Sequence, residues 1–270
     1  MNPIAMAVVS VSGIGLLCAV LLAVAARFMS VPVDERFPVI RGILPGANCG
    51  ACGYAGCDAY AQAMLDDPTV KSNLCVPGAD SVSRALSDAL GVAFEDVVAR
   101  VAVVRCQGNC DNTSHKMDYH GIDSCKAARL LYSGPGTCSY GCMGFGDCAK
   151  VCPYHAICIA GDGLAHINPL ICIGCGLCAD VCPNGVIELF PNQSTVHVAC
   201  NNHDKGAVAM KVCKTSCIAC KKCEKACLTG AITVVDQLAH IDQSKCNGCG
   251  TCVETCPKKC IVIETLCEKE

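Results

Sequence analysis

The sequence predicts an α+β protein that has an N-terminal transmembrane helix and is organised around metal clusters. Three observations predict this class. The 270 residues include 29 cysteines but no tryptophan, and only 4% are aromatic, so large side chains cannot fill an ordinary core. A cysteine spacing recurs four times after residue 137, and the first 26 residues carry no charged side chain. The net charge of −3 argues against a nucleic-acid binder, which would need a strongly basic face.

Residues 1–27 predict a transmembrane anchor. The run 4–26 is almost wholly apolar and would be about 35 Å long as a helix, enough for a hydrocarbon core of roughly 30 Å. A cleaved secretory signal is the alternative, but such signals begin with positive charge, and the first basic residue here is Arg27. Because basic residues follow the run and none precedes it, the clusters are expected on the cytoplasmic side of the inner membrane. Cys18 within the run is expected to pack as a small apolar residue.

Residues 28–46 predict an extended tether, because they contain Pro32, Pro38 and Pro45. A first cluster domain is expected over residues 47–92. One glycine-rich loop there contributes three cysteines and a fourth returns alone: Cys49, Cys52, Cys57 and Cys75. Four thiolates suit a 4Fe–4S cluster or zinc, but zinc sites more often use two C-x2-C pairs. The single crowded loop therefore favours iron–sulfur, and its glycines allow the backbone to approach the cluster closely.

The strongest signal is a repeated motif of the bacterial ferredoxin type, C-x2-C-x2-C-x3-C, which begins at Cys172, Cys217 and Cys246. A looser version, C-x3-C-x5-C-x3-C, begins at Cys138. The fourth cysteine of such a motif ligates the cluster of its partner motif, so two dicluster modules are expected, over residues 138–192 and 214–265. The predicted ligand sets are Cys138, Cys142, Cys148 and Cys182; Cys172, Cys175, Cys178 and Cys152; Cys217, Cys220, Cys223 and Cys256; and Cys246, Cys249, Cys252 and Cys227.

These ligand sets predict five 4Fe–4S clusters. Each ferredoxin module has only about 50 residues, a size at which a fold usually needs a staple such as bound metal. The alternative is that the clusters only stabilise the fold, but five clusters are more than stabilisation requires. We therefore expect electron transfer, with potentials tuned by burial and by hydrogen bonds to sulfur.

A segment of strand, thiol, helix and thiol precedes each module, at residues 93–137 and 193–213, and suggests an internal duplication. We expect these segments to supply a sixth cluster. The candidate ligands are Cys106, Cys125, Cys200 and Cys213, with Cys110 as a substitute. Reduced buried thiols or one disulfide are the alternatives. Cys158, Cys260 and Cys267 are expected to be packing or surface residues.

No Walker loop, dinucleotide fingerprint, nucleophile elbow or flavin signature is present, so no catalytic residue or substrate site is expected on this chain alone. The seven histidines show no metal-site spacing. Residues 205 to 225 contain only one acidic residue, Glu224, but six lysines. The lysines are Lys205, Lys211, Lys214, Lys221, Lys222 and Lys225. Such a surface could steer an acidic electron carrier, or it could be an ordinary solvated face.

The order of these parts resembles the B subunit of the Rnf-type ion-translocating ferredoxin:NAD oxidoreductase complex. The resemblance covers essentially the whole chain, and its most specific pieces are PGANCGACGYAGC at residues 45–57 and CSYGCMGFGDCAKVCP at 138–153. It implies a translocase subunit that takes electrons from soluble ferredoxin. Other membrane and soluble subunits would then carry flavin, NAD and Na⁺ or H⁺ transport. Two departures from the motif are Leu228, where proline is usual, and the wider spacing after Cys138.

Two other functions stay open at this point. A ferredoxin-like subunit of a hydrogenase or of a quinone-reducing membrane complex would share the repeated motifs, although the domain of Cys49 to Cys75 joined to an anchor argues against it. A zinc-bound scaffold would use the same thiols but would be colourless, whereas iron–sulfur clusters give a brown protein that dithionite bleaches.

Overall fold

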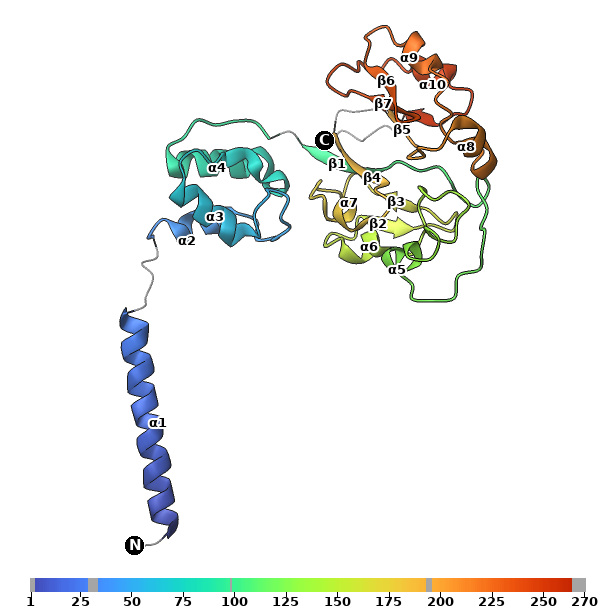
Figure 1. Ribbon diagram of the computed structural model, residues 1–270. Helices are drawn as coiled ribbons and strands as arrows, with labels where there is room; N and C mark the ends of the chain where they lie inside the picture. Colours follow the sequence, from blue (N-terminus) through green and yellow to red (C-terminus); the bar gives the residue numbers. More distant parts are fainter. Residues whose placement is uncertain (1–2, 29–33, 98, 193–195, 264–270) are drawn as a thin grey trace.

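The computed structural model describes residues 3–28, 34–97, 99–192 and 196–263; within the first range it describes the side chains of 11–25 and 27. The first range forms one helix, α1 (Pro3–Phe28), which confirms the predicted helix (Figure 1). All its side chains from 11 to 25 are exposed, including Cys18, which therefore does not pack as expected. Within the ranges given above, no helix has the length and apolar character needed to cross a membrane. The transmembrane prediction is therefore not confirmed.

A small helical unit follows. It consists of α2 (Phe37–Ile43), α3 (Cys57–Asp66) and α4 (Ala79–Leu90), with 3₁₀ turns η1 (Ser72–Leu74) and η2 (Val76–Gly78) between the last two helices. Ile40, Tyr60 and Leu86 are at most 1% exposed and form the centre of its core.

The prediction of an extended tether is wrong over α2. Pro38 lies in the first turn of α2, where its missing N–H costs nothing, so this proline starts a helix instead of extending the chain. Ile40 of α2 is buried against α3 and α4, which makes residues 37–43 part of the domain. Cys267 and residues 29–33 of the tether lie outside the described residues.

The rest of the described chain contains short helices and four two-stranded antiparallel sheets. The strands are β1 (Arg100–Val104), β2 (Ile157–Ile159), β3 (Ala165–Ile167), β4 (Ile187–Pro191), β5 (Val196–Val198), β6 (Ile232–Val235), β7 (Leu238–Ile241) and β8 (Ile261–Ile263). The helices are α5 (Cys125–Arg129), α6 (Asp147–Val151), α7 (Leu177–Val181), α8 (Gly206–Val212), α9 (Lys222–Ala226) and α10 (Thr251–Thr255).

The strands expected before each ferredoxin module are confirmed, and each pairs with the last strand of the module that follows it. β1 pairs with β4, and Val101 lies opposite Phe190; β5 pairs with β8, and His197 lies opposite Val262. Inside the modules β2 pairs with β3 and β6 with β7 (Figure 1). The same arrangement therefore occurs twice, as an internal duplication requires.

Each cysteine loop has two residues with positive φ at matching positions, which bends the backbone round a central point. The pairs are Gly144 and Gly146, Gly174 and Gly176, Ala219 and Lys221, and Gly248 and Gly250. Glycine adopts this conformation at no steric cost, whereas other residues pay about 1–2 kcal/mol. The short helices α6, α7, α9 and α10 start directly after the second position of each pair.

Candidate metal centres

The cysteines of the helical unit lie round one small cavity, which we call site 1: Cys49, Cys52, Cys57 and Cys75. All four residues predicted from the sequence are brought together here. Cys57 starts α3, and its backbone N–H donates to the Asn48 side chain at 2.9 Å, which fixes the loop before the helix. Burial, together with the nearby thiols of site 1, raises the pKa of the Cys75 thiol to about 11. A protein that must hold these groups as thiolates therefore needs a bound cation beside them.

Site 3 also contains the four residues expected from the sequence: Cys152, Cys172, Cys175 and Cys178. Its fourth ligand candidate comes from the end of α6, as exchange between partner motifs requires. The N–H of Ala102 in β1 donates to the Cys172 sulfur at 3.4 Å, so the strand from the inserted segment contacts this site directly. Burial raises the pKa of the Cys178 thiol to about 12, with a further contribution from the thiols of Cys172 and Cys175.

Site 4 brings together Cys217, Cys220, Cys223 and Cys256 round another small cavity. A fifth cysteine, Cys260, lies in the same place. It is 2% exposed, which agrees with the expectation of a packing residue, but its sulfur is only 3.6 Å from that of Cys256. The thiol hydrogen bond from Cys260 lowers the pKa of the Cys256 thiol to about 5. The contact of Cys260 with this site was not foreseen from the sequence.

Site 5 consists of Cys227, Cys246, Cys249 and Cys252, again the set expected from the motif. Cys252 is buried in the same hydrophobic core as site 4, and Cys227 and Cys246 pack against that core. Burial raises the pKa of the Cys252 thiol, and the nearby thiols of Cys246, Cys249 and Cys227 add to the increase. Cys249 is exposed, so this site reaches the surface.

Site 2 differs from the prediction. Its cavity is lined by Cys125, Cys142, Cys148 and Cys182, whereas the expected Cys138 lies elsewhere. Burial raises the pKa of the Cys148 thiol to about 12, and the thiols that contribute to this increase are those of Cys142, Cys125 and Cys182. Cys125 is therefore the fourth thiol at this site.

Helix α5 carries Cys125 into site 2, and two polar residues hold that helix in place. The Ser124 side chain accepts from the Ala127 N–H at the start of α5, and its hydroxyl donates to Asp147 at 2.8 Å. Asp147 also accepts from the N–H of Lys126 at 3.1 Å. Because Asp147 immediately precedes Cys148, these bonds place the first turn of α5 beside the loop of site 2.

An ungapped comparison of the motifs explains the exchange. CMGFGDCAKVCP, from Cys142, aligns with CIGCGLCADVCP, from Cys172, and Phe145 stands where the second cysteine, Cys175, is expected. The positive-φ positions Gly144 and Gly174 coincide in this alignment, which shows that the loops have the same shape. The loop from Cys142 therefore lacks one cysteine of the motif, and the structure places Cys125 at this site instead. The sequence contains this alignment, but it is missed when the motif is taken to begin at Cys138.

The donor set at each site fits an iron–sulfur cluster. Cysteine thiolates hold such clusters at separate iron corners, so the four ligands stand farther apart than the ligands of one ion. Across the parts of the chain that the structure describes, no group of three or more His, Cys, Asp or Glu side chains is arranged to hold a single metal ion. Small cavities bounded by four thiols and apolar side chains are what a cluster requires.

Fold and sites together define a multi-cluster iron–sulfur protein of the electron-transfer class. A family model described as a putative Fe-S cluster matches residues 44–77, which hold site 1. A model described as a 4Fe-4S dicluster domain matches residues 171–231 and 216–260. Its matches begin after the irregular motif of site 2.

Relatives identify the family. The B subunit of the ion-translocating oxidoreductase complex of Methanosarcina acetivorans is 39% identical over 93% of this chain and 94% of its own length. The B subunit of the Na⁺-translocating ferredoxin:NAD⁺ oxidoreductase complex of Acetobacterium woodii is 41% identical over 92% of this chain and 74% of its own length. The corresponding proton-translocating protein of Clostridium ljungdahlii is 40% identical, over 95% and 91%. The chain belongs to this family of B subunits, which confirms the resemblance found in the sequence.

Proposed function

We propose that this chain relays electrons from reduced ferredoxin to the partner subunits of an ion-translocating, NAD-reducing complex. The observation that carries the proposal is the presence of five separate four-thiol sites, sites 1 to 5, in one chain. When bound, a 4Fe–4S cluster at each site would accept and release one electron at a time. The named relatives from Acetobacterium and Clostridium act on ferredoxin and NAD⁺, which supports the same partners here.

The residues of the chain hold the clusters and set their potentials. Thiolates fix each cluster, apolar walls such as those of Tyr60 and Val186 keep water away, and backbone N–H groups that donate to sulfur stabilise the reduced state. The donation from Ala102 to Cys172 is one such bond. No acid, base or nucleophile is needed, because a single electron moves without any change in covalent bonds.

Membrane attachment is a further part of the proposal. The N-terminal sequence carries no charge before Arg27, and the side chains of residues 11–25 in α1 are exposed, so this helix presents an apolar surface to its surroundings. We propose that α1 attaches the chain to the inner membrane with the clusters on the cytoplasmic side. Flotation of the full chain with liposomes, compared with a chain that lacks residues 1–28, tests this part. Equal flotation of both proteins would contradict it.

Anaerobic purification tests the central proposal. The full chain should be brown, should bleach with dithionite and should contain at least about 20 iron atoms. Pull-down through this chain should recover companion subunits that reduce NAD with ferredoxin as the donor. A colourless, folded and active preparation would overturn the proposal. Companion subunits that reduce a quinone or evolve hydrogen would instead support another membrane oxidoreductase.

A further inference from the structure

Five thiols outside sites 1 to 5 line one cavity between the two ferredoxin modules. The cavity measures about 860 Å³, whereas the cavities of sites 1 to 4 measure about 10–20 Å³. Four of these thiols, which we call site 6, belong to Cys106, Cys138, Cys200 and Cys213. Three of them are the residues expected from the inserted segments. The fourth is Cys138, which the sequence motif had assigned to site 2.

Distances in the cavity place three of these sulfurs close together, those of Cys106, Cys138 and Cys213. The sulfurs of Cys106 and Cys213 lie 3.4 and 3.9 Å from a single point, the position that a Cβ on Gly108 would occupy. Likewise, the sulfurs of Cys106 and Cys138 lie 3.6 and 3.7 Å from the corresponding point on Gly141. The two sulfurs of each pair can therefore be no farther apart than the sum of their distances to the shared point.

Each thiol of site 6 has a hydrogen-bonding partner of the kind that stabilises a cluster ligand. Cys106 accepts from the N–H of Gly108 at 3.4 Å, and the Thr215 hydroxyl is 3.4 Å from the Cys213 sulfur. Asn202, which is 1% exposed, directs its side-chain nitrogen at the Cys138 sulfur at 3.5 Å. Such donors to sulfur are a main determinant of cluster potential.

Site 6 is adjacent to both modules. The N–H of Cys142, a residue of site 2, donates to the Cys106 sulfur at 3.4 Å. The N–H of Cys217, a residue of site 4, donates to the Cys200 sulfur at 3.3 Å. Cys106 packs against the core that contains sites 2 and 3, and Cys200 is buried in the core that contains sites 4 and 5.

We propose that Cys106, Cys138, Cys200 and Cys213 bind a sixth 4Fe–4S cluster and that this cluster connects the two ferredoxin modules. The proposal rests on the proposed electron-relay function and deepens it. The electron moves in two transfers. One transfer is between sites 2 and 6, and the other is between sites 6 and 4. In each step the site that loses the electron is oxidised and its neighbour is reduced, with no proton or atom transferred. Reduced ferredoxin supplies the electrons.

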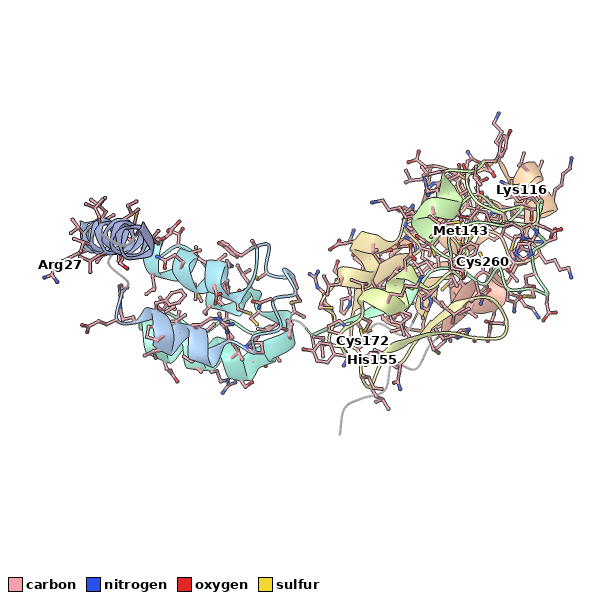
Figure 2. All side chains as sticks on the ribbon, turned by 90° about the horizontal axis from the view of Figure 1, so that it is seen from below. Arg27, Lys116, Met143, His155, Cys172 and Cys260 are labelled. Atoms are coloured by element: carbon pink, nitrogen blue, oxygen red, sulfur yellow. The ribbon has the colours of Figure 1, made fainter. Side chains whose placement is uncertain are left out.

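The sites then form a single order, 1–3–2–6–4–5. Sites 2 and 3 share one core, and so do sites 4 and 5. Tyr154 lines the cavity of site 3. Figure 2 shows its neighbour His155 together with Cys172 on the side of the C-terminal modules nearest the helical unit. Electron tunnelling falls steeply with distance, so an order of adjacent sites predicts the path.

Cys110 is not part of this ligand set, although it also lines the cavity. Its side chain is exposed, and its thiol donates to the backbone oxygen of Asp162 at 3.2 Å. Replacement of Cys110 by alanine is therefore a suitable control, because it removes a thiol from the same cavity without removing a proposed ligand.

Iron content of paired variants tests the proposal in the full chain, purified anaerobically. The wild type should contain about 24 iron atoms and the Cys110→Ala control should match it. Cys138→Ala and Cys213→Ala should each lose about four, and the double variant should lose no more than either single change, because both residues hold the same cluster. Cys125→Ala combined with Cys213→Ala should lose about eight.

The opposite pattern would overturn the assignment: a loss of about eight from Cys138→Ala with Cys213→Ala, and about four from Cys125→Ala with Cys213→Ala. A wild type with about 20 iron atoms, unchanged by Cys213→Ala, would overturn the sixth cluster while leaving the electron-relay function intact. A wild type without iron would overturn that function itself.

A second measurement does not depend on variants that lose a cluster. Asn202→Ala should keep all the iron but lower the midpoint potential of one cluster, because the reduced state loses a hydrogen bond to Cys138. Electron paramagnetic resonance during a redox titration measures this shift. Potentials identical to those of the wild type would contradict the presence of a cluster at Cys138.

Discussion

Replacement of Gly174 by alanine should remove site 3 from the folded chain. Gly174 lies between Cys172 and Cys175 with φ of +69°, and a Cβ there would be 2.3 Å from the backbone oxygen of Arg100. Real Cβ atoms essentially never approach so closely, and a backbone atom of β1 cannot rotate away. The strand must therefore move. Because Ala102 of β1 donates to the Cys172 sulfur, the displacement also breaks that hydrogen bond.

Gly185 provides a matched control in the same module. Its φ is +60°, but nothing lies within 4 Å of the position that a Cβ would occupy. The equivalent position in other motifs carries His155 and Lys259, both with φ of +50°, so a side chain is tolerated there. Gly185→Ala should cost only the left-handed conformation, about 1 kcal/mol. Gly174→Ala has the same conformational cost. The overlap with β1 destabilises it further, by about 1–3 kcal/mol or more, which is the cost of overpacking a core.

The assay is anaerobic heating at a fixed scan rate. The loss of visible cluster absorbance is recorded during heating and gives the midpoint temperature. For a folding unit of 60–100 residues, an extra 2 kcal/mol corresponds to a midpoint about 8 °C or more lower. Purified Gly174→Ala should also contain about four fewer iron atoms than Gly185→Ala. Equal midpoints and equal iron contents would contradict the prediction, because they would show that β1 does not press on the loop of site 3.

Three other predictions concern the rest of the molecule. Lys221 and Lys222 are exposed beside site 4, so their joint replacement by glutamate should raise the KM for an acidic ferredoxin several-fold at low salt, and little in roughly 0.5 M salt; an unchanged KM at low salt would leave them as an ordinary solvated face. Cys260→Ala should retain all the iron and shift one potential, whereas Cys256→Ala should lose about four iron atoms; equal losses would make Cys260 a ligand. Burial, with a smaller effect of the nearby Arg105 charge, lowers the pKa of His197 to about 4. Between about pH 6.5 and pH 4 the unfolded histidine takes up a proton and the folded one does not, so stability should be full above this window and fall by about 1 kcal/mol per pH unit within it. His197→Leu should abolish this dependence in thermal scans, and a persisting slope would assign it to another group.

The sequence predicted the features that depend on local spacing. Exchange of the fourth cysteine between partner motifs places Cys152 in site 3, because a loop that supplies three corners of a cluster cannot also reach the fourth. The strands of the inserted segments were likewise visible as apolar runs. Their pairing with β4 and β8 was not, because register between strands more than about 60 residues apart depends on packing rather than on local pattern.

The origin of the remaining ligands could not be determined from spacing alone. Phe145 removes one cysteine from its loop, and several free thiols could have replaced it. The hydrogen bonds of Asp147 to the start of α5 help to place Cys125 at this site. Cys138 is then released to the cavity of site 6. The prediction of an extended tether was wrong for a different reason. A proline can start a helix as well as interrupt one, and the burial of Ile40 decides in favour of the helix.

The pairing of β1 with β4 has a consequence for how the protein is made. During synthesis β1 leaves the ribosome long before β4, and the loops of sites 2 and 3 emerge between them. The two strands enclose those loops only once β4 has appeared, so the interval before pairing leaves the thiols open to the cellular machinery that delivers iron and sulfide. A strand placed directly beside its partner in sequence would close that interval early.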